Sequence, residues 1–267
     1  YNYEINSITK GDTTTPKVTY SGNPKSINYS VTSGNSYANV DSNTGIVTGT
    51  GAGNAVITAT FTNYDNTTVT ATQNIKVTYT PYTITNLMTN GSFENEITGW
   101  YNMPKYWEQN STFAKFGNHS LGLNSRKNQI FARYNVFDYN SHNVYNHYIY
   151  VKSSAYIFPD APELEPLMYA IFSETNDTCW PSLAKEVTQS GQKGLLSTWQ
   201  DISIYTKADY SYIILMLAQA NDNAEGNMYY DGVTIVDLTA TFGDDIPSKE
   251  WCDKHINYFD GTSTIYK

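Results

Sequence analysis

Hydrophobic and polar residues alternate with a period of two in several short runs near the start of this chain. In the first 80 residues the alternation is clearest at 17–20, 27–31, 55–60 and 73–78, and clusters of turn residues separate these runs. A strand directs successive side chains to opposite faces, so this pattern predicts half-buried strands that pair in a small antiparallel sandwich.

The second part of the chain is also dominated by predicted strands, with candidate runs at 120–123, 129–134, 147–152, 167–172, 199–205 and 212–217. Polar loops separate these runs and no long helical period interrupts them, which favours a two-sheet jelly roll. After residue 237 the pattern changes. A turn and then a short helix are expected near Pro247, because Pro and an early Glu250 suit a first helical turn. The predicted fold class is therefore all-β, with two sandwiches and a short C-terminal helix.

A step in composition predicts the domain boundary. All five tryptophans and both cysteines follow residue 90, while the first 80 residues are rich in Thr, Val, Asn and Gly. We expect a small domain at 1–80, a larger one at 84–240, and a tail at 241–267 whose helix packs on the larger domain. Pro81 would end strand pairing at the joint.

Charge excludes some classes of partner. Charged residues make up 15% of the chain, against about 25% in typical proteins, and the net charge is −9. Nucleic-acid binding and attraction to an anionic membrane are disfavoured, and no apolar run approaches the roughly 20 residues of a membrane span. Because the chain does not begin with Met or a signal-like segment, we expect it to be the C-terminal fragment of a longer protein.

The two cysteines, Cys179 and Cys252, fit no metal-binding spacing. Two reduced, buried thiols are the preferred interpretation. A disulfide between them is the alternative.

Residues 40–59 carry a turn with Asp41, Thr44 and Gly45, followed by a Gly-x-Ala-x-Ile-Thr-Ala run from Gly53. This pattern resembles the bacterial immunoglobulin-like group two domains over most of 1–80. The resemblance implies a spacer or a weak adhesion module.

Two segments of the larger domain carry a second resemblance. The run 90–100, Asn-Gly-Ser-Phe-Glu at its start and Gly-Trp at its end, and the run 228–235, Met-Tyr-Tyr-Asp-Gly-Val-Thr-Ile, resemble the opening and closing strands of jelly-roll carbohydrate-binding modules of the family four, nine and twenty-two type. The resemblance implies that Glu94 and Asp231 bind a structural Ca²⁺, helped by backbone carbonyls near the first turn and the loop 117–121. Ser92 and Asn118 are the candidates whose backbone carbonyl oxygens would bind the ion. The alternative is that both acids accept hydrogen bonds from Lys, Arg or backbone donors.

Sugar binding requires aromatic planes and hydroxyl-binding groups. Trp107 and Trp180 have polar and turn-forming neighbours, so we expect them in loops, either stacking on a sugar or packing against the protein. Trp100 and Trp199 are expected in the core. Weaker candidates are Tyr106, Arg133, Tyr134, Asn135 and Gln219.

Catalysis has little support in the sequence. Asp160, Glu163 and Glu165 share a stretch with three prolines, which predicts an extended loop instead of a rigid carboxylate pair. The four histidines form no His-Glu-x-x-His pattern, and there is no Gly-x-Ser-x-Gly motif. We therefore expect no enzymatic activity.

The tail gives a third resemblance. Residues 237–261 are similar to the C-terminal tail of bacteriophage minor structural and tail proteins, although Asp244, Asp245 and Ile246 depart from the usual residues before the Pro. The resemblance implies an extracellular virion location in a tail or baseplate, contact with other tail proteins, and adhesion to a host cell-surface polysaccharide, with repeated copies or a homo-oligomer raising avidity. The alternatives are an accessory region of a secreted bacterial glycoside hydrolase or adhesin, and a purely structural virion decoration or spacer.

Overall fold

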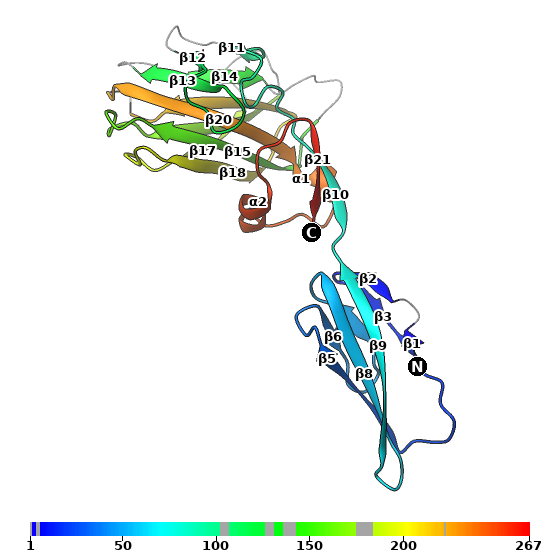
Figure 1. The fold of residues 1–267 in the computed structure, drawn as a ribbon. Coiled ribbons are helices and arrows are strands. Elements are labelled where there is room, and N and C mark those ends of the chain that lie inside the picture. The colour runs from blue at the N-terminus through cyan, green and yellow to red at the C-terminus, as the bar shows by residue number, and fades with distance from the viewer. Residues whose placement is uncertain are drawn as a thin grey trace. The chain divides into compact units, whose positions relative to one another are not determined.

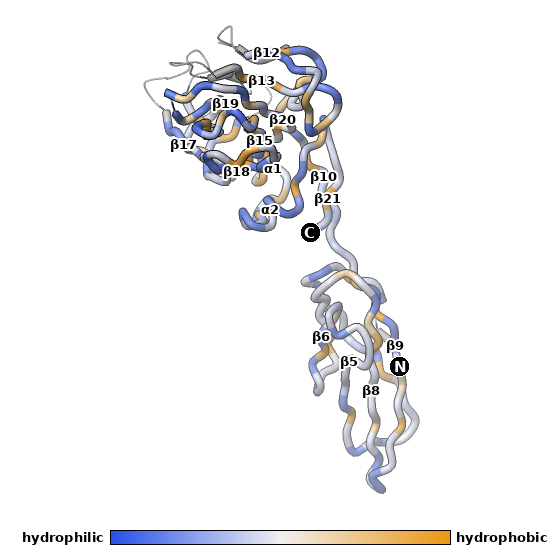
Figure 2. The backbone as a smooth tube through the Cα atoms, turned by 60° about the vertical axis from the view of Figure 1, so that its left-hand side comes forward, coloured by the Kyte–Doolittle hydropathy of each residue, from blue (hydrophilic) through white to orange (hydrophobic). Residues whose placement is uncertain are grey.

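The computed structural model describes residues 2–3, 6–101, 107–125, 131–135, 143–174, 184–221 and 223–267. The chain forms two compact units, Tyr1–Pro81 with Tyr266–Lys267, and Tyr82–Ile265 (Figure 1). Strands dominate both units, and hydrophobic and hydrophilic stretches alternate along the backbone (Figure 2). The predicted fold class is confirmed. No helix in the described ranges is long and apolar enough to cross a membrane.

Unit 1 is built from short strands around a small apolar core. Its strands are β1 (Asn2–Tyr3), β2 (Ser7–Thr9), β3 (Thr13–Thr14), β4 (Pro16–Lys17), β5 (Ser26–Ser33), β6 (Ala38–Val40), β7 (Val47–Gly49), β8 (Gly53–Thr62) and β9 (Thr68–Thr78). They form sheets in the orders β2-β9-β8-β5, β3-β7-β6 and β1-β4. Ile8, Val47, Ile57 and Ile75 are buried between the two larger sheets. The resemblance to an immunoglobulin-like domain stays a prediction.

The turn predicted at Gly45 is present. The Oδ1 atom of Asp41 accepts hydrogen bonds from the backbone N–H groups of Asn43 and Thr44, at 3.0 and 2.7 Å. Gly45 has φ +75°, and a Cβ there would lie 2.8 Å from the rings of Pro16 and Tyr29. Glycine is therefore required at this position by both conformation and space.

Unit 2 is a larger two-sheet sandwich. Its elements are β10 (Pro81–Thr85), β11 (Trp100–Tyr101), β12 (Trp107–Asn110), β13 (Ser120–Ser125), β14 (Phe131–Asn135), β15 (Tyr148–Ile157), β16 (Pro166–Ser173), β17 (Ala184–Ser190), β18 (Trp199–Lys207), β19 (Tyr212–Gln219), β20 (Gly226–Asp237), α1 (Leu238–Phe242), α2 (Lys249–His255) and β21 (Thr262–Tyr266). One sheet has the order β11-β14-β19-β16-β17, here called the β19 sheet. The other has the order β12-β13-β20-β15-β18, here called the β20 sheet. β10 pairs with β21.

The core of unit 2 lies between these two sheets. Alternate residues of β19, such as Ile213 and Leu215, pack against Met228 and Tyr230 of β20. Tyr230 also joins the sheets through hydrogen bonds, because its buried hydroxyl accepts the N–H of Leu167 at 2.7 Å and donates to the carbonyl of Ala218 at 2.5 Å. Trp100 is buried against Phe93, with ring centroids 5.2 Å apart, which confirms Trp100 as a core residue.

The C-terminal tail packs on the outer face of the β20 sheet. The predicted short helix is α2, and the side chain of Ser248 caps it by accepting the N–H of Trp251. A second helix, α1, lies where only a turn was expected, and Asp237 caps it in the same way. Apolar residues of both helices join Tyr150 and Val236 of the sheet in one buried cluster, which also holds Cys252. Cys179 lies outside the described residues, so its pairing stays open.

Candidate functional site

Glu94 and Asp231 hold one loop, residues 115–119, from its two ends. Asp231 Oδ2 accepts the backbone N–H groups of Lys115 and Phe116, at 2.7 and 2.8 Å. Glu94 Oε1 accepts those of Asn118 and His119, both at 2.8 Å. We call Glu94, Asp231 and the loop 115–119 the acid clamp. The two widely separated acids of the sequence are thus brought to the same loop.

The pKa values of the two acids move in opposite directions. Burial raises the pKa of Asp231 to about 6, although three backbone N–H groups bond to the carboxylate, and the charge of Glu94 raises it further. Burial also opposes the ionisation of Glu94, but the N–H groups of Asn118 and His119 outweigh it and lower the pKa of that carboxyl. The two acids therefore differ in the pH at which they ionise.

Hydrogen-bond donors face the carboxylates of Glu94 and Asp231 in this arrangement. The N–H of Gly232 donates to Asp231 Oδ1 at 2.7 Å, so backbone donors meet three of the four carboxylate oxygens, and His119 Nδ1 lies 3.2 Å from the fourth, Glu94 Oε2. Ca²⁺ requires six to eight oxygen ligands instead. Within the described ranges, no three or more His, Cys, Asp or Glu residues gather as a potential metal site. The two acids accept hydrogen bonds from backbone donors, which is the alternative that the sequence left open. Calcium binding, with the carbonyl oxygens of Ser92 and Asn118 as further ligands, stays a prediction.

Aromatic residues line up across the outer face of the β20 sheet. In register, Gly122 pairs with Tyr229, Tyr229 with Tyr156, and Tyr156 with Trp199. Residues directly opposite in neighbouring strands share a face. A Cβ on Gly122 would lie 3.0 Å from the Tyr229 ring, so the glycine makes room for that ring.

Two phenylalanines complete this group. Phe113 lies 4.2 Å from Tyr156 and Phe158 lies 5.4 Å from Tyr229, measured between ring centroids. All of these rings are half-buried. We call Phe113, Tyr156, Phe158, Trp199 and Tyr229 the aromatic row.

Polar residues follow on the same face, two positions further along the strands. Ser154 pairs in register with both Asp201 and Asp231. Lys115 Nζ donates to Ser154 Oγ at 2.8 Å and to Asp201 Oδ1 at 2.7 Å. Lys152, two residues beyond Ser154, places its Nζ 3.2 Å from Asp201 Oδ2. The face therefore carries charged and hydroxyl groups directly beside the aromatic row.

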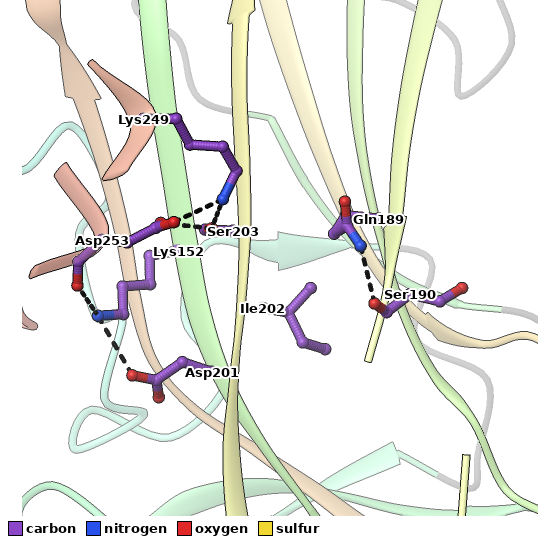
Figure 3. A pocket seen from close by; sticks show the side chains of 8 residues that line it. All are labelled: Lys152, Gln189, Ser190, Asp201, Ile202, Ser203, Lys249 and Asp253. Atoms are coloured by element: carbon purple, nitrogen blue, oxygen red, sulfur yellow. Dashed lines mark hydrogen bonds and ion pairs between the residues drawn. The ribbon is translucent and has the colours of Figure 1, made fainter. Parts of the chain in front are cut away.

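A cavity of about 350 Å³ opens at these polar residues, between β15, β17, β18 and α2 (Figure 3). Lys249 of α2 donates to Ser203 Oγ and pairs with Asp253 Oδ2, both at 2.7 Å. Burial opposes ionisation of Asp201, but bonds from Lys115 and Ser154 and the charge of Lys152 outweigh it, so the pKa of Asp201 falls to about 2. The cavity lining is therefore charged but internally paired, and it offers both donors and acceptors. We call it the polar pocket.

The outer face of the β19 sheet carries Ile171, Ile214 and Met216, which are buried, beside Tyr169. β14 is the strand of Arg133 and Tyr134, and these residues pair in register with Met216 and Leu215. Their side chains, like that of Asn135, lie outside the described residues. Their predicted role in sugar binding stays a prediction.

The structure corrects the predicted positions of two tryptophans. Trp107 lies in β12, not in a loop, and it is 4% exposed and stacks on Tyr230 with centroids 6.2 Å apart. Its pairing with Leu123 puts it on the inner face, so its ring offers no open surface. Trp199 was expected in the core and lies instead in the aromatic row. Gln219 is also buried, and Trp180 and Tyr106 lie outside the described residues.

Comparison with known proteins gives similar structures but no family match. No protein-family profile matches the chain, and neither does any curated protein. A family 16 carbohydrate-binding module is similar at 13% identity and a TM-score of 0.42, over 57% of this chain and 99% of the other. The C-terminal family 22 module of Clostridium thermocellum Xyn10B is similar at 16% and 0.42, over 56% and 96%. The CBM22-1 xylan-binding domain of Paenibacillus barcinonensis Xyn10C is similar at 13% and 0.43, over 57% and 94%.

Proposed function

We propose that unit 2 is a non-catalytic glycan-binding module and that its ligand lies on the outer face of the β20 sheet. The observation that carries this proposal is the aromatic row on this face, with the polar pocket beside it at the β18 edge. A pyranose ring has an apolar C–H face, which stacks on aromatic rings, and a rim of hydroxyl groups, which require donors and acceptors. The two parts of this face match these two parts of a sugar.

The spacing supports the same conclusion. Trp199 and Asp201 are two residues apart on β18, as are Tyr156 and Ser154 on β15, which corresponds to about 6–7 Å along a strand. A sugar stacked on Trp199 would therefore have hydroxyl groups within reach of Asp201. A longer glycan would continue into the polar pocket, where Lys249 and Ser203 offer further polar groups.

The experiment compares the parent protein with Trp199→Ala and Trp199→Phe on a glycan array, followed by titration calorimetry with the best ligand. Trp199→Ala should bind at least about tenfold more weakly, equal to roughly 1.4 kcal/mol, while Trp199→Phe should retain most of the affinity because it keeps a ring. Tyr145→Ala is the matched control, since Tyr145 is 55% exposed in unit 2 and is not part of the aromatic row.

Two outcomes would contradict the proposal. Unchanged binding by Trp199→Ala, with normal thermal unfolding, would move the site away from this face. A parent protein that retains no glycan would favour the alternative of a structural spacer.

The biological context is a finer part of the proposal. The resemblance of residues 237–261 supports a bacteriophage tail or baseplate protein that adheres to host cell-surface polysaccharide, alongside other tail proteins and in repeated copies. The alternative is that the chain is an accessory region of a secreted bacterial glycoside hydrolase or adhesin. Mass spectrometry of purified virions tests this point, because absence of the chain from the particles would favour this alternative.

A further inference from the structure

Unit 1 contains a cavity of about 420 Å³ at one end of its sandwich. The loop 19–24 forms one wall, and the ends of β8 and β9 form the other. Tyr20 and Val69 line the cavity and are 51% and 60% exposed. Phe61 pairs in register with Val69 and lies beside the Tyr20 ring.

The lining combines aromatic rings with neutral polar groups. The Tyr20 and Phe61 rings meet edge to face, with centroids 5.8 Å apart, so Phe61 supports Tyr20 from the side. Asn23 and Asn63 contribute amides. The Asn63 amide donates to Thr67 Oγ1 at 3.0 Å, which fixes its orientation. A supported ring beside amide groups, one of them held in place, is the chemistry that a saccharide requires.

The charge of the lining narrows the ligand class. None of the described residues that line the cavity carries a charge. An acidic sugar or a phosphate would lack a cationic partner here, and burying it unpaired would be costly. The lining therefore favours a neutral, polyhydroxylated ring.

We propose that the Tyr20 cavity is a second binding site, specific for neutral saccharides. It shares no residue with the aromatic row or the polar pocket. Two sites on one chain would raise the avidity for a polymeric glycan without any new contact at either site. Unit 1 would then bind a glycan at a defined site, whereas its sequence resemblance implies only a spacer or a weak adhesion module.

The test uses the full chain on an array of neutral and acidic oligosaccharides, with Tyr20→Ala, Tyr20→Phe and Trp199→Ala. Tyr20→Ala should weaken the binding of at least one neutral oligosaccharide about tenfold, or roughly 1.4 kcal/mol. Tyr20→Phe should retain it, because the ring is kept. Tyr64→Ala is the matched control, since Tyr64 in the same unit is 73% exposed and does not line the cavity. Adding Tyr20→Ala to Trp199→Ala should remove the binding that remains.

The outcomes separate this proposal from the function proposed for unit 2. Loss of binding in Trp199→Ala, with full retention in Tyr20→Ala, would overturn the second site and leave the first intact. Loss of binding in Tyr20→Ala, with full retention in Trp199→Ala, would overturn the site proposed on unit 2 and leave the second site intact. Dependence on Tyr20 that extends only to acidic glycans would overturn the neutral specificity. A lower unfolding temperature of Tyr20→Ala with unchanged glycan binding would mean that the ring only closes the end of the sandwich.

Discussion

Replacing Gly117 with alanine tests the acid clamp directly. Gly117 lies between the two pairs of N–H groups that the acids accept, and its φ is +69°. A Cβ at this position would lie 2.4 Å from Glu94 Oε1 and 2.7 Å from its carboxylate carbon. Alanine would therefore push the Glu94 carboxylate away from the N–H groups of Asn118 and His119.

Two terms contribute to the expected loss of stability. Placing alanine in the left-handed region costs about 1 kcal/mol. Loss of the two charge-assisted bonds at a partly exposed carboxylate costs about 1 kcal/mol each, after partial replacement by water. The expected total is about 3 kcal/mol for Gly117→Ala.

Gly261→Ala is the matched control, because Gly261 has a similar φ of +64° but no atom within 4 Å of its would-be Cβ. Its expected cost is about 1 kcal/mol, from conformation alone. Urea unfolding followed by tryptophan fluorescence reports on unit 2, since every tryptophan follows residue 90. Equal losses in the two variants, within about 0.5 kcal/mol, would refute the clamp.

Three further predictions follow from the same face of unit 2. The folded-state pKa of Asp231, about 6, lies above its ordinary value of 3.8, so protonation favours the folded state. As the pH falls from about 7 to about 5, the free energy of unfolding of the parent should rise by about 1 kcal/mol relative to Asp231→Asn. No such rise in urea unfolding would contradict this sign. Because backbone donors occupy the carboxylates, exchanging millimolar Ca²⁺ for EDTA should shift the unfolding temperature by less than about 1 °C, whereas a rise of several degrees with Ca²⁺ would support the calcium prediction. Lys152→Met removes an ion pair to Asp201 and the donor to the carbonyls of Asp253 and Ile256. Asp201 keeps Lys115 as a partner, so the expected cost is about 2 kcal/mol, from the carbonyls that lose their donor, and unchanged stability would mean that this network contributes little.

Much of the fold could be predicted because half-buried strands alternate and strands buried on both faces form short apolar runs bounded by polar loops. The runs at 167–172 and 212–217 lie within β16 and β19, as expected. β17 was missed, since its sequence, Ala-Lys-Glu-Val-Thr-Gln-Ser, has little apolar signal. It lies at the edge of its sheet, where pairing with a single neighbour suffices.

The candidate site was harder to predict than the fold. Alternation shows that Tyr156 and Phe158 share a face, but not that Trp199 and Tyr229 join them, because register between distant strands is set by the fold. Trp107 was misplaced for a related reason. Its polar neighbours Glu108 and Gln109 suggested a loop, whereas β12 is an edge strand whose inner face alone is apolar.

The acid clamp and the proposed glycan-binding face, which carries the aromatic row, are linked through the segment that joins β12 to β13. Asn110 Oδ1 accepts the N–H of Phe113 at 2.9 Å, and Asp231 accepts those of Lys115 and Phe116. The same segment thereby sets Phe113 on Tyr156 within the aromatic row and Lys115 on Asp201 at the polar pocket. A buried acid, which costs stability when ionised, is thus used to position the residues that would contact a ligand. Gly117→Ala should consequently weaken glycan binding as well as folding, although Gly117 belongs to neither the aromatic row nor the polar pocket.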